Sequence, residues 1–165
     1  MANVFDVAAY ILRRMADIEP GAITAWKLQK LVYYSQAWSL VWDDAPIFEE
    51  PIEAWANGPV CPALYARHRG EFKVSKLPVG DETALSQDEI ETIEKVIEHY
   101  GKHSSQHLSQ LTHAEAPWIG AREGLAPGER GNHVIPHDAM AEYYGGLYEE
   151  DDQGEAAREA VAFSQ

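Results

Sequence analysis

The chain lacks the features that mark most secreted and membrane-spanning proteins. Its single cysteine, Cys61, cannot form an internal disulfide, and its place between Val60 and Pro62 favours a small buried side chain over a reactive thiol. No run of 18 apolar residues occurs, and Met1 to Tyr10 lacks the basic residues of a signal peptide. We therefore expect a cytoplasmic protein that does not enter a membrane.

Basic residues are scarce as well. Lys and Arg number 13 against 27 Asp and Glu, which gives a formal net charge of -14. A surface of this sign repels phosphate backbones, so direct binding of nucleic acid is not expected. At 165 residues the chain suits one domain with a single hydrophobic core.

The motifs of common enzyme classes are also missing. The sequence holds no P-loop, no Gly-x-Gly-x-x-Gly and no Gly-x-Ser-x-Gly elbow, so we expect no catalytic residue and no cofactor. A small hydrolase that uses His113, Glu115 or Cys61 is the enzyme alternative.

Three histidines have a spacing that can hold a metal. His99, His103 and His107 lie four residues apart, and on an unbroken helix such side chains can share one ion. Gly101 and the capping residue Ser104 are expected to break the helix between them. We therefore expect no metal site.

The most distinctive segment is WKLQKLVYYSQAW, residues 26–38. Its apolar residues recur at helical spacing and Thr24 is a suitable N-cap, which predicts a helix. Leu and Trp side chains are expected to point into the core. The polar side chains placed on or beside the opposite face are Lys27, Gln29, Lys30 and Gln36.

Prolines, glycines and capping residues predict the other elements. Ile47 to Trp55 is expected to be an ordered loop or short strand, followed by a turn at Asn57-Gly58-Pro59. Glu71 to Val79 has the alternation of a short strand or hairpin, and Val134-Ile135 that of a brief extended segment. Other helices are expected after Asn3, Ser86 and Ser104, from Pro62 and Pro117, and from Pro136 toward Tyr144, where Gly145-Gly146 stops the last one.

The predicted fold class is mainly α: a single compact multi-helix domain with a small β element. The domain is expected to cover residues 1–148. Residues 149–165 contain six acids against Arg158 alone, which is typical of an acidic, mobile tail.

Four motifs resemble one known family. Leu28 to Tyr34, Phe48 to Trp55, Gly58 to Val60 and Thr112 to Trp118 match, in this order, the pattern of the Panacea domain, which includes SocA-like antitoxins and phage-associated proteins. The resemblance covers roughly the first 145 residues. It implies a mostly helical antitoxin of a type II-like toxin–antitoxin system, which binds its toxin directly. The cognate toxin protein is then expected from the adjacent gene.

The resemblance also points to residues that contact the toxin. Helical packing alone does not require the Gln-Lys-x-x-aromatic pattern of residues 29–33. We therefore expect a partner to bind polar and aromatic side chains that flank the buried apolar stripe of the helix predicted after Thr24. The candidate partner-binding residues are Lys30, Tyr33, Gln36, Trp55, Asn57, Gly58, Pro59 and Val60. A proteolytic adaptor that delivers a toxin to a protease is the alternative function. Whether the chain forms a homo-oligomer stays open.

Overall fold

The computed structural model describes the backbone of residues 1–164 and the side chains of residues 1–150. Its elements are α1 (Val4–Ile18), β1 (Ile23–Thr24), α2 (Ala25–Trp42), β2 (Glu53–Trp55), β3 (Gly58–Val60), α3 (Pro62–His68), β4 (Lys73–Val74), the 3₁₀ helix η1 (Glu82–Ala84), α4 (Gln87–Tyr100), α5 (Ser105–His113), α6 (Ala116–Ala121) and α7 (His137–Ser164). Helices dominate and both sheets are small, so the mainly α fold class is confirmed.

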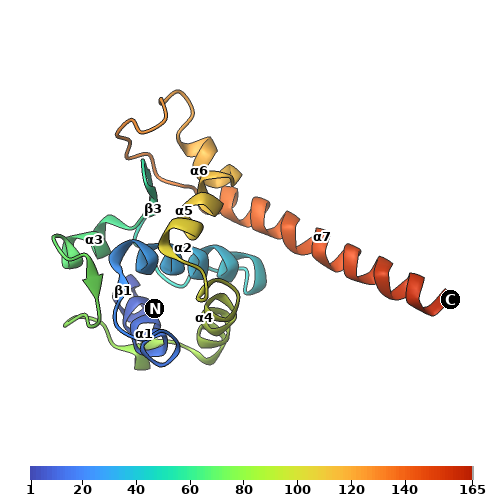
Figure 1. Ribbon diagram of the computed structural model, residues 1–165, viewed down its shortest axis with the longest axis horizontal. Coiled ribbons are helices and arrows are strands. Elements are labelled where there is room, and N and C mark those ends of the chain that lie inside the picture. The colour runs from blue at the N-terminus through green and yellow to red at the C-terminus, as the bar shows by residue number, and fades with distance from the viewer. Residues whose placement is uncertain (165) are drawn as a thin grey trace.

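Helix α2 lies at the centre of the body. It contacts α1, α4, α5, α7 and β3, which surround it (Figure 1). Leu28, Leu31 and Val32 are fully buried, as the apolar spacing predicts. The polar residues of this helix are buried too, because the surrounding elements leave it no wide solvent face.

The predicted helix starts are confirmed by their caps. Asn3 and Ser86 each form a capping box, with Asp6 and Glu89 three residues later. The Thr24 side chain accepts a hydrogen bond from the backbone N–H of Lys27 and so begins α2. Caps of this kind depend on near neighbours in the chain, and the sequence therefore predicts them well.

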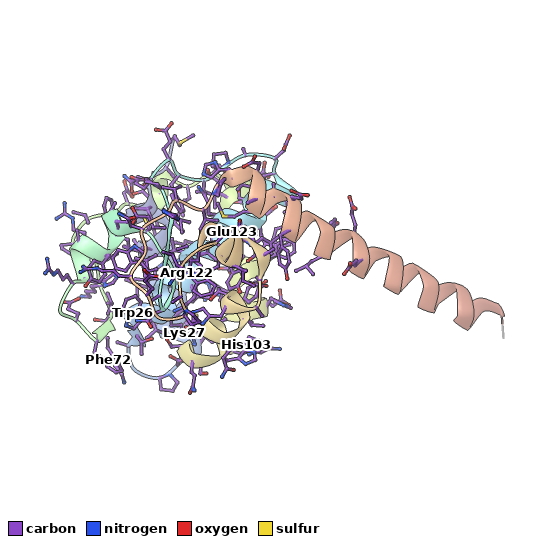
Figure 2. All side chains as sticks on the ribbon, turned by 90° about the horizontal axis from the view of Figure 1, so that it is seen from above. Trp26, Lys27, Phe72, His103, Arg122 and Glu123 are labelled. Carbon is purple, nitrogen blue, oxygen red and sulfur yellow. The ribbon has the colours of Figure 1, made fainter. Side chains whose placement is uncertain are left out.

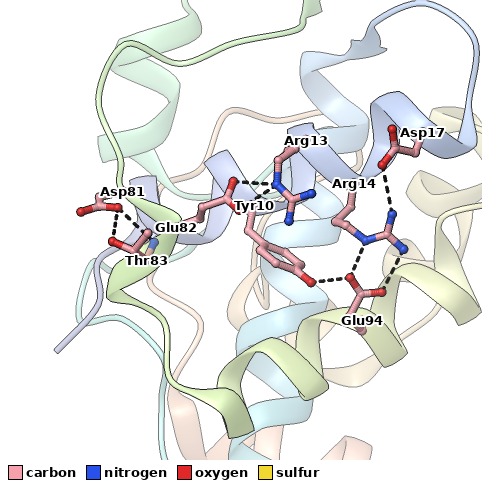
Figure 3. Close-up of polar contacts among 8 residues, drawn as sticks. All are labelled: Tyr10, Arg13, Arg14, Asp17, Asp81, Glu82, Thr83 and Glu94. Carbon is pink, nitrogen blue, oxygen red and sulfur yellow. Dashed lines mark hydrogen bonds and ion pairs between the residues drawn. The ribbon is translucent and has the colours of Figure 1, made fainter.

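Polar side chains fasten α1 to α4 and to η1 (Figure 3). The Arg14 Nε lies 2.6 Å from Glu94 Oε1, and the Tyr10 hydroxyl donates to the same carboxylate. Arg13 Nε pairs with Glu82 at 2.7 Å. These contacts lie on the solvent side of α1, so the ion pairs add modestly to a packing that is mainly apolar.

One of the two small sheets joins segments that are distant in sequence, and the other is a local hairpin. Strand β1 pairs with β4 in an antiparallel sheet, with Ile23 opposite Val74. The prediction of an element at 71–79 is thus confirmed only for two residues, and the hairpin alternative is wrong because the partner strand precedes α2. Strands β2 and β3 form the other antiparallel pair, with Trp55 opposite Gly58, and Val134 adds an isolated bridge to Glu53.

Helix α7 differs from its prediction. Gly145 and Gly146 do not stop it, and it continues to Ser164, extending away from the body (Figure 1). Neither glycine has a positive φ, and Leu147 packs against the core just beyond them. A glycine in a helix costs about 1 kcal/mol, which packing of the following turn can offset.

The acidic tail was expected to start at residue 149. Most of that tail, from residue 151 on, has side chains outside the described part, so its mobility stays a prediction. Within the helices that the structure describes, none combines the length and apolarity that crossing a bilayer requires.

Candidate binding surface

Two glutamines of α2 hold the 47–61 segment in place. The backbone N–H of Cys61 donates to Gln29 Oε1 at 2.9 Å. The Gln36 side chain accepts from the N–H of Ile47 and donates to the carbonyl of Phe48, both at 2.8 Å. These amides satisfy backbone groups at the two ends of the segment, outside the β2–β3 pairing, so both glutamines have a structural role in a buried site.

A buried network of hydroxyls and one carboxyl joins α2 to α7. The Tyr34 hydroxyl donates to Glu115 Oε1 at 2.7 Å and the Tyr144 hydroxyl donates to the same oxygen at 2.9 Å. The hydroxyls of Tyr33 and Tyr144 lie 3.0 Å apart. Burial raises the pKa of Glu115, although the two tyrosine hydrogen bonds oppose this shift. Tyr33 therefore faces α7 inside the body.

The β2–β3 hairpin is held from three sides. Trp118 Nε1 of α6 donates to the carbonyl of Trp55 at 2.8 Å, and Ser109 Oγ of α5 donates to that of Asn57 at 2.8 Å. A guanidinium nitrogen of Arg122 donates to the carbonyl of Ala54 at 3.0 Å. The Thr112 to Trp118 motif thus has a structural role, because it fixes the hairpin and supplies Glu115 to the tyrosine network.

Gly58 begins β3 with a backbone that other residues rarely adopt. Its φ is 131°, and a Cβ at this position would lie 2.9 Å from Lys30 Cε. A side chain would therefore be strained and would also press on the lysine. The predicted turn is confirmed with shifted bounds: it lies at Ala56 and Asn57, whereas Gly58 and Pro59 already belong to β3, which packs on α2.

Two cavities lie on either side of the Trp26 and Asn57 side chains. The larger, about 620 Å³, is lined by Trp26, Glu53, Trp55, Ala56, Asn57, Gly128, Arg130, Gly131 and Asn132. The smaller, about 330 Å³, is lined by Thr24, Trp26, Lys30, Asn57, Phe72, Ser105, Gln106 and Ser109. We call the surface formed by both sets of residues the hairpin face.

The hairpin face is rich in aromatic side chains. Tyr65 lies between two tryptophans, with ring centroids 6.3 Å from Trp26 and 5.0 Å from Trp55. Phe72 is 71% exposed on the same side of the body as Trp26 (Figure 2). Aromatic side chains with one open side are typical anchors of protein interfaces.

Few of the predicted partner-binding residues are exposed. Asn57 is exposed and Trp55 is half-buried, and both lie on the hairpin face. Lys30, Tyr33 and Gln36 are at most 1% exposed, and Gly58, Pro59 and Val60 are buried as well. The expectation that Lys30 and Gln36 lie on an open face of α2 is wrong, because Gly58 of β3 packs on Lys30 and the backbone of Ile47 and Phe48 packs on Gln36. Their contact with a partner remains a prediction.

Several residues of the hairpin face were not predicted. Trp26 stands in the distinctive segment, but helical spacing does not show which tryptophan keeps an open side. Phe72 was assigned only to a strand, and Arg130 belongs to a loop without a motif. These three residues meet through tertiary contacts, for which a single sequence carries no signal.

The cysteine and the clustered histidines are placed unfavourably for nucleophilic catalysis and for metal binding. Burial raises the pKa of the Cys61 thiol to about 11, so the nucleophilic thiolate is disfavoured. The rings of His103 and His107 lie 4.3 Å apart, whereas His99 packs on Tyr100. Among the side chains that the structure describes, no three His, Cys, Asp or Glu residues gather as metal ligands would.

The molecule is thus a mainly α domain in which α2 organises a hairpin and an aromatic surface. Residues 28–119 match the family described as antitoxin SocA-like, Panacea domain. This match covers more than half of the chain, and the protein belongs to that family. All four motifs named above lie inside the matched range. No curated protein and no solved structure matches the chain.

Proposed function

We propose that this protein neutralises a toxin by binding it directly through the hairpin face, without catalysis. The observation that carries the proposal is the convergence of the matched motifs. All four pack together, in α2, the two strands of the β2–β3 hairpin and the junction of α5 with α6, and they hold an aromatic surface with two cavities beside it. Family membership supports an antitoxin-type role, and the hairpin face supplies a surface on which a protein can dock.

The chemistry of this face suits a protein partner. Trp26 and Trp55 are half-buried and each packs on the neighbouring Tyr65, so little conformational entropy is lost when a partner covers them. The net charge of -14 steers the whole chain toward a basic partner. The charged residues that line the two cavities are Glu53, Lys30 and Arg130, so the hairpin face itself can pair with groups of either sign.

The test is co-expression with the product of the adjacent gene. The tagged wild-type chain is expected to restore growth and to retain the neighbouring protein through purification. Asn57→Arg places a bulky charge on the hairpin face and is expected to weaken both. Ala84→Arg, at an exposed position of η1 outside both cavities, is the matched control and should behave as wild type.

Two outcomes would count against direct neutralisation. Growth that is restored while the neighbouring protein is never retained would contradict it. Rescue that disappears when a cellular protease is deleted would support the adaptor function instead. If Asn57→Arg rescues growth and retains the neighbouring protein as well as Ala84→Arg does, the hairpin face is not the contact surface.

A further inference from the structure

The smaller cavity of the hairpin face contains a charge without a counter-charge. Lys30 is 1% exposed, and its Nζ lies 5.6 Å from the centre of the Trp26 ring. Among the described side chains, none forms an ion pair or hydrogen bond with this ammonium group. The other buried lysine, Lys27, differs because its Nζ pairs with Glu19 at 2.9 Å.

The ammonium group stays charged at neutral pH. Burial lowers the pKa of Lys30 to about 8, still above the pH of the cytoplasm, so most molecules carry the proton. No fully buried side-chain nitrogen of the described residues lacks a hydrogen-bond partner, so the Lys30 Nζ keeps contact with the cavity while the rest of the side chain is buried. A largely desolvated cation without a counter-charge is costly. Its side chain lines the cavity and is therefore within reach of a group that enters it.

Two helix starts add positive potential at the same place. Thr24 caps α2 and lines the cavity, and Ser105 and Gln106 line it from the first turn of α5. Helix N-termini carry partial positive charge and attract anions. None of the described residues that line this cavity is an Asp or Glu. A cationic pocket thus occurs in a chain whose net charge is -14.

We propose that the Lys30 pocket receives an Asp or Glu carboxylate from the toxin that this chain neutralises. The inference rests on the proposed function, and it adds the chemical group that the surface recognises. One buried ammonium matches the single charge of a carboxylate, and the hydroxyl of Ser105 and the amide of Gln106 are donors for its second oxygen. The half-buried Trp26 and the exposed Phe72 also line the cavity, and their rings would reduce the contact of the ion pair with water once a partner is bound.

The first arm of the test needs no toxin. Lysine labelled with ¹³C at Cε is followed by NMR while acetate replaces chloride at constant ionic strength, and Lys30→Met assigns the signal. Acetate is expected to shift the Lys30 signal in a saturable way and to raise its pKa. Lys76, which is exposed, is the internal control and should show no saturation. A Lys30 signal that ignores acetate would overturn the proposal, and so would one that saturates only with inorganic phosphate.

The second arm uses the complex with the toxin. Lys30→Met keeps most of the unbranched apolar stem and removes the charge, and it is expected to weaken the complex about tenfold or more. Lys76→Met should bind as wild type. If Lys30→Met binds as tightly as wild type, the carboxylate contact is wrong while direct neutralisation stands. If the wild type itself forms no complex, the proposed function is wrong, and the acetate arm alone decides whether the pocket binds carboxylates.

Discussion

Replacing Lys30 by methionine is expected to stabilise the free protein. The ammonium group has a pKa of about 8 in the folded chain against an ordinary value of 10.5, because burial disfavours its charge. A difference of about 2.5 pKa units corresponds to about 3 kcal/mol at neutral pH. Methionine loses the attraction to the Trp26 ring, worth about 1 kcal/mol. The net gain is about 2 kcal/mol, or about 4 to 8 °C in melting temperature for a chain of this size.

The pH dependence tests the physical reason for this gain. Since the pKa of Lys30 is lowered on folding, the unfolded chain binds the proton that the folded chain releases between about pH 8 and 10.5. The wild type therefore gains stability as the pH rises above 8, and the advantage of Lys30→Met shrinks. The buried tyrosines have raised pKa values, so their ionisation in the unfolded chain destabilises the folded chain above about pH 10. Stability should therefore be compared only up to about pH 9.5.

Urea denaturation of both proteins from about pH 7 to 9.5 measures the effect. Lys76→Met removes an exposed lysine and should change the free energy of unfolding by less than about 0.5 kcal/mol at each pH. The reasoning is refuted if Lys30→Met is less stable than wild type at pH 7. A stability difference that does not vary with pH would also refute it.

Three further changes test other parts of the structure. Gly58→Val should lower the free energy of unfolding by about 1 to 3 kcal/mol, because φ is 131° there; melting at the wild-type temperature would contradict this. Glu115→Gln keeps an acceptor for both tyrosine hydroxyls. Because burial raises the pKa of Glu115, the wild type loses stability as the pH rises through that pKa, so melting curves should show the glutamine variant at least as stable at pH 7. Truncation after Tyr148 should change stability by less than about 0.5 kcal/mol, and a large loss would mean that the removed residues dock on the core.

The local features of the fold could be predicted because they depend on near neighbours. The caps at Asn3, Thr24 and Ser86 act within three residues, and the Gly58 turn needs a backbone that few residues tolerate. The end of the last helix could not be predicted in this way. Gly145 weakens a helix in isolation, but packing of the neighbouring turns decides whether it continues.

The burial of α2 could not be predicted from its pattern. Gln29 and Gln36 read as a polar flank, yet their partners Cys61 and Ile47 lie 32 and 11 residues away in the chain. Such partners satisfy the polar groups inside the body, and no local rule anticipates them. The hairpin face could not be predicted for the same reason. It is formed by α2, β2, α5 and the 128–132 loop, which come together only in the folded molecule.

Hydrogen–deuterium exchange of the purified complex tests the central claim most directly. Backbone amides of the toxin-bound chain are compared with those of the free chain, peptide by peptide. We expect protection at residues 55–58, 104–109 and 128–132, which border the two cavities, and little change in α1 or α4. Protection confined to α1, α4 or the end of α7 would contradict binding through the hairpin face.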